Sequence, residues 1–304
     1  MTSKPNKYLW RYPKGPTSGF AKWAWLNGEF VPWDEATVHV RSETAMRGIN
    51  VFEGIRGYWS KEDRQLYVFR LAAHMERMAY SAKIIKLQSH FSEKEITDAL
   101  IELIVRNEIR EDLHIRPMVY LDIGDFAFYE PDEIFTGATI TVTTRPTMLP
   151  NNPSIHCCVS TWSRLTDNSQ PPRANVGANY INSRLAAIEA RLNGYDSSIM
   201  LNHDGEVTEG PGASVMMVRK GKVISPAVYG DVLEGITQDT VLELFAGELG
   251  VEVIQRPIDR TELYLCDELF FIGTGGGEIT PILSVDKRPV GSGEAGPLTT
   301  AMQQ

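Results

Sequence analysis

The sequence predicts an α+β protein of two domains. Strand-like and helix-like segments are mixed over residues 1–145, which we expect to form a small domain with an N-terminal arm. A stretch rich in proline and asparagine follows at residues 146–153 and indicates a linker. The pattern restarts over residues 154–304, where strands dominate, and predicts a larger second domain.

Local signals predict the elements of the first domain. Asn27-Gly28 favours the tight turn of a hairpin over residues 23–33. Ser92 and Glu95 have the spacing of a capping box, and the apolar spacing that follows predicts a helix from Ser92 to Asn107. The spacing of apolar residues predicts strands at 50–59, 64–69, 114–123 and 138–146, and a helix at 71–87.

The second domain shows the same kinds of signal. Gly194 and Gly250 follow helical patterns and predict where those helices end. In chain order we expect a strand at 155–161, a helix at 179–193, hairpins at 197–210 and 214–226, a helix at 237–249, and strands at 251–258 and 268–275.

Composition narrows the class of protein. The 304 residues are 42% hydrophobic and 23% charged, as in globular domains, and the net charge of −9 argues against nucleic-acid or membrane partners. The three cysteines show no CxxC pair, and residues 1–22 show no apolar signal segment. We therefore expect a cytoplasmic protein without disulfides.

Four segments have residue types suited to chemistry. Thr208–Gly212 sets Glu209 among glycines, where a carboxylate could meet a ligand or simply occupy a turn. In residues 233–239 a glycine precedes a helix start, which suits a phosphate or an ordinary cap. Residues 273–278 form a glycine-rich turn, a phosphate nest or a loop. Residues 173–183 are uninformative alone.

Familiar catalytic and metal motifs are absent from the sequence. It contains no HExxH, GxSxG or P-loop pattern, and its six histidines are scattered. We expect no metal site.

Taken in order, longer segments resemble the branched-chain amino-acid aminotransferases, the class IV family that uses pyridoxal 5′-phosphate (PLP). The resemblance covers nearly the whole chain from about Trp23. Its segments are LNGEFVPWDEATVHV, VFEGIRGY, HIRP, GANYINSRLAAIEARLNGYD, VTEGPGAS, LEGITQD, LYLCDELFFIGTGGGEITPI and SVD. It implies a PLP fold-type IV architecture (α+β or α/β, similar to D-amino-acid aminotransferase), a PLP cofactor between the domains, and a homodimer.

The resemblance also implies roles for individual residues. Glu209 matches the acid on the pyridine nitrogen, Tyr180 the tyrosine on the 3-hydroxyl, and Arg77 the arginine on the phosphate. The phosphate cup is implied to include Ile236, Thr237 and Thr274, with Leu233 against the ring. The substrate side is implied to comprise Phe52, Gly54, Arg47, Arg56, His114, Arg116 and Gly275.

One departure from the family pattern stands out. The lysine that forms a Schiff base in the family lies four residues before the Asn of the Asn-Tyr pair, and that position is Asn175 here. An amide forms no imine and is no base, so ordinary transamination is expected to be impaired. The substitution is either engineered or natural.

Other departures fall on the substrate side. Arg47 and His114 stand where many members of the family have tyrosine, and Gly212-Ala213-Ser214 replaces Gly-Glu-Asn. Arg47, Arg56 and Arg116 together predict a positive substrate pocket and an acidic, carboxylate-bearing substrate.

Two classes of function therefore remain open. One is an aminotransferase-like protein that holds PLP or its amine form without a covalent bond, with His114 or Tyr180 as candidates to move a proton. The alternative is a PLP-independent lyase, isomerase or cyclase that reuses the pocket, or a relative that only binds.

Overall fold

The computed structural model describes residues 21–123, 135–274 and 278–304. Its first half contains the strands β1 (Trp23–Leu26), β2 (Glu29–Pro32), β3 (Asn50–Phe52), β4 (Ile55–Ser60), β5 (Gln65–Val68), β6 (Leu113–Leu121) and β7 (Thr136–Thr144). The helices of this half are α1 (Glu43–Arg47), α2 (Leu71–Ile84) and α3 (Glu93–Asn107), with a 3-10 turn η1 (Trp33–Glu35).

The second half is richer in strands. They are β8 (Ile155–Val159), β9 (Ser197–Ile199), β10 (Glu209–Gly210), β11 (Ala213–Arg219), β12 (Lys222–Ser225), β13 (Val253–Gln255), β14 (Glu268–Gly273), β15 (Glu278–Val285) and β16 (Arg288–Pro289). The helices are η3 (Gly177–Asn179), α4 (Tyr180–Leu192), α5 (Ile236–Gly247), η4 (Arg260–Tyr264) and α6 (Pro297–Gln303).

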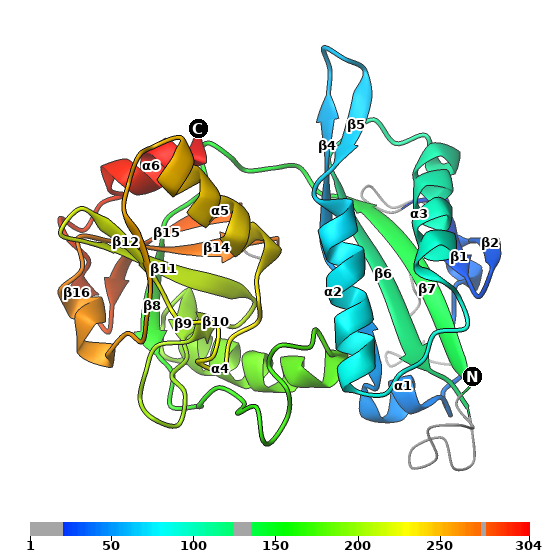
Figure 1. Ribbon diagram of the computed structural model, residues 1–304, viewed down its shortest axis with the longest axis horizontal. Coiled ribbons are helices and arrows are strands. Elements are labelled where there is room, and N and C mark those ends of the chain that lie inside the picture. The colour runs from blue at the N-terminus through cyan, green and yellow to red at the C-terminus, as the bar shows by residue number, and fades with distance from the viewer. Residues whose placement is uncertain (1–20, 124–134, 275–277) are drawn as a thin grey trace, which may run out of the picture.

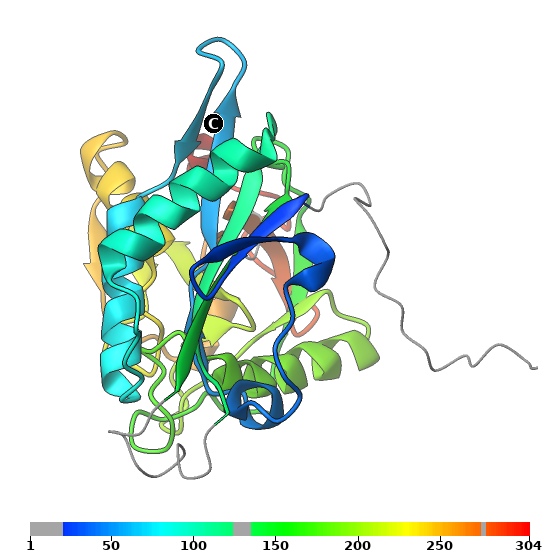
Figure 2. The same ribbon diagram turned by 90° about the vertical axis from the view of Figure 1, so that its right-hand side faces the viewer.

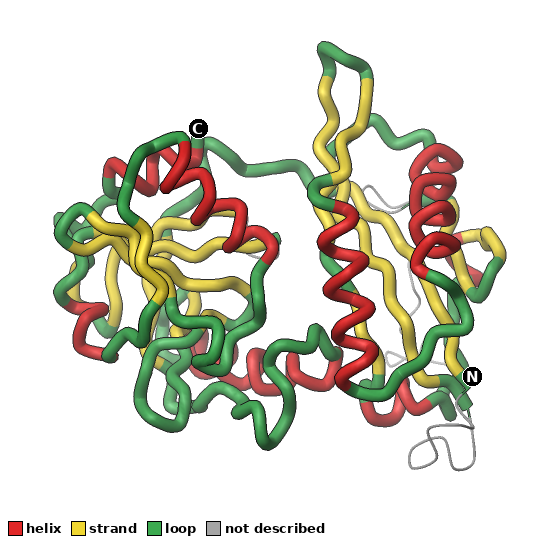
Figure 3. Tube along the Cα trace, in the orientation of Figure 1, coloured by secondary structure: helices red, strands yellow, loops and turns green. Residues whose placement is uncertain are grey.

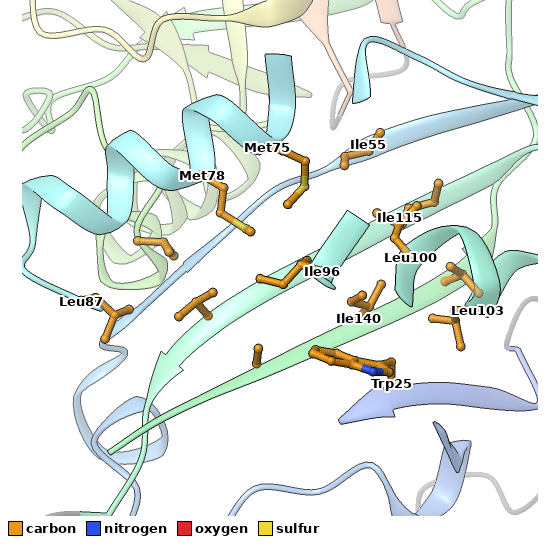
Figure 4. Packing of buried hydrophobic residues seen from close by; sticks show 14 of the residues in the cluster. Trp25, Ile55, Met75, Met78, Leu87, Ile96, Leu100, Leu103, Ile115 and Ile140 are labelled. Carbon is orange, nitrogen blue, oxygen red and sulfur yellow. The ribbon is translucent and has the colours of Figure 1, made fainter. Parts of the chain in front are cut away.

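The first sheet is antiparallel and has the order β2-β1-β7-β6-β4-β5, with β3 also paired to β6. Helices α2 and α3 lie together on one face of this sheet, and the β4–β5 hairpin projects beyond them (Figures 1 and 2). Figure 4 shows the core between these layers, where Met75 and Met78 of α2 and Leu100 of α3 approach strand residues such as Ile55 and Ile115. Burial of these apolar side chains stabilises the packing of α2 and α3 on the first sheet.

The second sheet has the order β13-β12-β11-β14-β15-β8-β9, and β12–β13, β15–β8 and β8–β9 are parallel pairs. Strand β14 shows why this sheet is covered on both sides. Alternate residues of a strand point to opposite faces, so Phe270 joins the cluster that includes α5, while Phe271 joins the cluster on the other face. Figure 3 shows the connection between the two sheets, a loop that runs through residues 145–154.

Most of the predicted elements are confirmed, and the architecture is the mixed α and β fold that the sequence predicts. The α3 capping box is present: Glu95 N–H donates to Ser92 Oγ (3.2 Å), and Ser92 N–H donates to Glu95 Oε2 (2.7 Å). Asn27 and Gly28 both have positive φ, as the β1–β2 turn requires. The sequence patterns missed α1, β15, β16 and α6.

The prediction of one continuous strand at residues 50–59 is wrong. Residues 50–59 do not form one strand, because the chain breaks between β3 and β4 at Glu53-Gly54. The break lets Glu53 N–H donate to the Pro117 carbonyl (3.0 Å) and buries the Glu53 side chain completely. Alternation alone could not predict this break. None of the helices among the described residues combines the length and the apolar character of a membrane span.

Candidate functional site

A cavity of about 530 Å³ lies where the two halves of the chain meet. The first half contributes α2, the β3–β4 break and β6 to its wall, and the second half contributes the starts of α4 and α5, strand β10 and the end of β14. The structure brings these predicted site residues together in the wall: Phe52, Gly54, Arg77, His114, Arg116, Asn175, Tyr180, Glu209, Leu233, Ile236, Thr237 and Thr274.

One end of the cavity suits an anion. Helix α5 begins there at Ile236, and its N-cap is Gly235, for which the structure shows no capping side chain among the described residues. The first N–H groups of a helix carry a partial positive charge and need acceptors. Arg77 reaches the same place from α2, where its Nη1 donates to the Glu234 carbonyl (2.8 Å). A phosphate fits this combination.

Glu53 fixes the position of Arg77. Its two carboxylate oxygens accept from Arg77 Nε (2.9 Å) and Nη2 (2.6 Å), and its Oε2 also lies 2.8 Å from His74 Nδ1. Burial alone raises the pKa of Glu53, but the hydrogen bonds with His74 and Arg77 outweigh it, and the net pKa is lowered. Glu53 is therefore an anion that holds two side chains at the cavity wall.

A second buried carboxylate, Glu209, lies in the cavity wall on β10. Its Oε1 is 2.7 Å from Arg164 Nη2, and its Oε2 accepts from the Leu233 N–H (3.2 Å). Burial raises the pKa of Glu209, although Arg164 and the Leu233 N–H oppose this effect. A ligand with a protonated ring nitrogen would favour the ionised form of Glu209, because the ligand adds a positive charge near the carboxylate.

Asn175 lies in the cavity wall and is 5% exposed. Its Nδ2 donates to the Phe52 carbonyl (2.6 Å), and its Oδ1 accepts from the Tyr180 hydroxyl (3.2 Å). Burial and the charge of Glu209 raise the pKa of Tyr180, so this phenol stays protonated at neutral pH. Within the described residues, the cavity wall includes no lysine.

The substrate side combines aromatic and basic groups. The Arg116 guanidinium lies over the Phe52 ring at 4.9 Å, and the Phe52 and Tyr180 rings are 5.2 Å apart. Burial and the nearby charges of Arg116, Arg145 and Arg56 lower the pKa of His114 to about 4. His114 is therefore neutral at pH 7. Gly54 packs closely against it, because a Cβ there would lie 3.1 Å from His114 Nε2 and the imidazole would have to shift slightly.

Two predicted substrate residues lie elsewhere in this chain. Arg47 is on α1, outside the cavity wall, and forms an ion pair with Glu43 one helical turn away. Arg56 is buried outside the wall, and its Nε lies 2.9 Å from Glu278 Oε1. Both arginines are paired with carboxylates, and neither side chain lines the cavity. Gly275 lies outside the described residues.

The sequence patterns missed Glu53, which holds Arg77 from behind the wall, and several residues of the wall itself. Glu53 lies in the VFEGIRGY segment without a motif that marks its role, and Arg164 follows a strand with no signal of its own. His74 and Arg145 also line the cavity. The only available signal was the HxxR spacing of His74 and Arg77, which places both on one face of a helix.

Comparisons with known proteins agree with this geometry. Residues 50–285 match the family described as amino-transferase class IV. A probable branched-chain-amino-acid aminotransferase of Aquifex aeolicus is 38% identical over 92% of this chain and 90% of its own length. The branched-chain-amino-acid aminotransferase of Escherichia coli K12 is 38% identical over 95% of this chain and 93% of its own.

A solved structure gives the same answer. The branched-chain amino acid aminotransferase of Thermobaculum terrenum, in its PLP form, is 41% identical and superposes with a TM-score of 0.88. The superposition covers 93% of this chain and 92% of that one. The resemblance predicted from the sequence is confirmed: the chain belongs to the branched-chain amino-acid aminotransferase family of class IV aminotransferases.

Proposed function

We propose that this protein binds PLP, or its amine form, without a covalent bond, and acts on a substrate that carries a carboxylate. The observation that carries the proposal is the pairing of an intact cofactor cavity with Asn175. Arg77, Glu209 and the start of α5 share one cavity, while residue 175 presents an amide to Phe52 and Tyr180.

The cavity wall fits PLP group by group. Glu209 is a buried carboxylate suited to a pyridine nitrogen, and the relative from Thermobaculum terrenum is solved in its PLP form. Arg77, Thr237 and Thr274 would hold the phosphate together with the N–H groups of Ile236 and Thr237, and Leu233 would lie against the ring. When bound, PLP supplies an electron sink that stabilises negative charge on the substrate.

The described residues of the cavity wall can bind and orient the cofactor, but they include no lysine that could act as the base. Asn175 cannot attach the cofactor, and its amide takes no proton at neutral pH. His114 has a pKa of about 4, and the pKa of Tyr180 is raised, so neither is a ready base at pH 7. We infer that ordinary amino-group transfer is impaired.

A carboxylate on the substrate is favoured by the charge of the wall. Arg116 and Arg145 both line the cavity, and both contribute to the lowered pKa of His114 in its wall. A planar guanidinium can bind a carboxylate through two hydrogen bonds. The anionic substrate proposed from the sequence therefore rests on Arg116 and Arg145, which line the cavity, and not on Arg47 and Arg56, which do not line it.

The organisation of the chain is part of the proposal. We assign residues 1–145 to a small domain, 146–153 to a linker and 154–304 to the cofactor-binding domain, with a homodimer as the assembly. Arg47 is half exposed on α1, away from its own cavity. In the dimer, it is a candidate for the pocket of the partner subunit.

Spectroscopic titration tests the cofactor. Purified protein is titrated with PLP and, separately, with pyridoxal, which lacks the phosphate. We expect saturable binding of PLP and at least about tenfold weaker binding of pyridoxal, because a charged phosphate makes several hydrogen bonds in the cup. No uptake of PLP at near-millimolar concentration would reject the proposal and favour a PLP-independent lyase, isomerase or cyclase.

A further inference from the structure

One face of the first sheet carries the basic part of the cavity wall. Leu113 and Ile115 of β6 lie in the core that α2 and α3 cover. Since alternate residues of a strand point to opposite faces, His114 and Arg116 point away from that core. Both side chains line the cavity.

Arg145 extends this pattern from the neighbouring strand. On β7, Thr143 lies opposite His114, and Arg145 follows two residues later. The Arg145 N–H donates to the Asp112 carbonyl (2.8 Å), which continues the β6–β7 ladder by one step, and the side chain of Arg145 lines the cavity. Because Asp112 and Arg116 lie two residues before and after His114, the wall has one arginine on each side of His114.

Asp112 fixes the direction in which the chain leaves β7. Its Oδ2 accepts from the Thr147 N–H (3.0 Å), and its Oδ1 accepts from the Trp59 N–H on β4 (2.8 Å). Together with the bond from the Arg145 N–H to the Asp112 carbonyl, these contacts tie the backbone on both sides of Pro146 to one residue of the sheet.

A fixed backbone matters for a long side chain at a binding site. Ordering one such side chain when a ligand binds weakens affinity by about two- to tenfold, and a held backbone reduces the ordering that Arg145 requires. His114 adds no charge between the two arginines at pH 7, because burial, followed by the charges of Arg116 and Arg145, lowers the pKa of His114 to about 4.

We propose that Arg145 is a specificity-determining residue that binds an acidic group of the substrate, and that Asp112 is the positioning residue that holds Arg145 at the wall. A substrate with two carboxylates can then meet Arg116 with one carboxylate and Arg145 with the other. Both roles rest on the acidic substrate proposed above, whereas the hydrogen bonds of Asp112 do not.

The ligand arm of the test compares glutarate with valerate, which has one carboxylate fewer. Calorimetry measures both affinities and needs no signal from a cofactor. The proteins are the wild type, Arg145→Gln, Asp112→Ala, the double variant and Glu111→Ala. Glu111 is the exposed neighbour of Asp112, so its variant is a matched control that loses the same charge.

We expect the wild type to prefer glutarate, and Arg145→Gln to lose at least about tenfold of that preference, because an arginine–carboxylate pair is strong. Asp112→Ala should lose about two- to tenfold, the cost of ordering one freed side chain. Loss of a negative charge alone would instead strengthen the binding of a dianion. Glu111→Ala should therefore keep or increase the preference for glutarate.

Since Asp112 acts through Arg145, the double variant should lose no more preference than Arg145→Gln. If the wild type prefers glutarate and Arg145→Gln keeps that preference, the role of Arg145 is overturned while the acidic substrate stands. An unchanged or larger preference in Asp112→Ala would overturn the role of Asp112. Equal affinity of the wild type for both acids would reject the acidic substrate, and both roles with it.

A second arm uses the protein without ligand. Hydrogen exchange at the Trp59 and Thr147 amides is compared in the wild type, Asp112→Asn and Glu111→Gln. Asparagine has one acceptor oxygen for these two N–H groups, so at least one amide should exchange about two- to tenfold faster, the range of one hydrogen bond. Unchanged exchange at both amides would overturn the positioning role. Asp112→Asn also replaces Asp112→Ala in the ligand arm if the alanine variant does not fold.

Discussion

The carboxylate of Glu53 holds the guanidinium of Arg77 through two hydrogen bonds of 2.9 and 2.6 Å, in a position where Glu53 is fully buried. The same carboxylate also lies 2.8 Å from His74. The helix residue proposed to bind the phosphate thus depends on an acid from the break between β3 and β4. This dependence makes Glu53 a direct subject for mutation.

We expect Glu53→Gln to lower the free energy of unfolding by about 3–5 kcal/mol, because it leaves buried partners without their charge. Urea unfolding at pH 7 measures this, with the exposed Glu294→Gln as the matched control.

The lowered pKa of Glu53 also makes the stability of the fold depend on pH. Its contribution is present above the ordinary value of 4.5 and is lost as the pH falls below that value. An equal loss of stability in acid for wild type and Glu53→Gln would contradict this role.

Glu209→Gln should weaken the binding of PLP. The variant keeps the size of the side chain but removes the charge offered to the ring nitrogen. A hydrogen bond to a charged group contributes about 1.5–3 kcal/mol, which corresponds to about 10- to 150-fold in affinity. Titration of both proteins with PLP measures the change, and Glu294→Gln is again the control. Undiminished affinity would show that Glu209 does not contact the ring.

The pH dependence of the free energy of unfolding tests the lowered pKa of His114. Its pKa falls from 6.5 to about 4 in the folded protein, so the unfolded chain binds a proton more readily over that range. The free energy of unfolding should therefore decrease as the pH falls from 6.5 toward 4. Urea titrations across this range should show a smaller decrease for His114→Gln, which cannot titrate. Parallel curves for the two proteins would contradict the lowered pKa.

Arg116→Gln tests the substrate class. Glutarate and valerate have the same chain length and differ by one carboxylate, so their affinities isolate the second charge. We expect wild type to prefer glutarate, and Arg116→Gln to lose about tenfold or more of that preference, since a bidentate pair with a carboxylate is strong. The exposed Arg191→Gln is the control. Equal affinity of the wild type for both acids would count against an acidic substrate.

The sequence predicts elements well where the signal is local. The start of α3 follows from Ser92 and Glu95, three residues apart, and the first hairpin follows from Asn27-Gly28. The break at Glu53-Gly54 was missed because it depends on pairing with β6, which lies far along the chain.

The same limit applies to charge in the site. From the sequence alone Arg56 is expected to face the substrate, yet it is buried and paired with Glu278 from the other half of the chain. Likewise, the pairing of Arg164 with Glu209 joins two segments that share no motif. Motifs could predict which residues meet in the cavity, but ion pairs between distant segments decide which charges remain available there.

The proposed function requires a PLP cavity that persists in this protein without covalent attachment. The most direct measurement is the intact mass of the protein after saturation with PLP and reduction with borohydride, beside Asn175→Lys. We predict saturable PLP binding by wild type with no adduct in the cavity, and an adduct at residue 175 in Asn175→Lys. A wild-type adduct on a lysine within the cavity, or no PLP binding by either protein, would contradict the account.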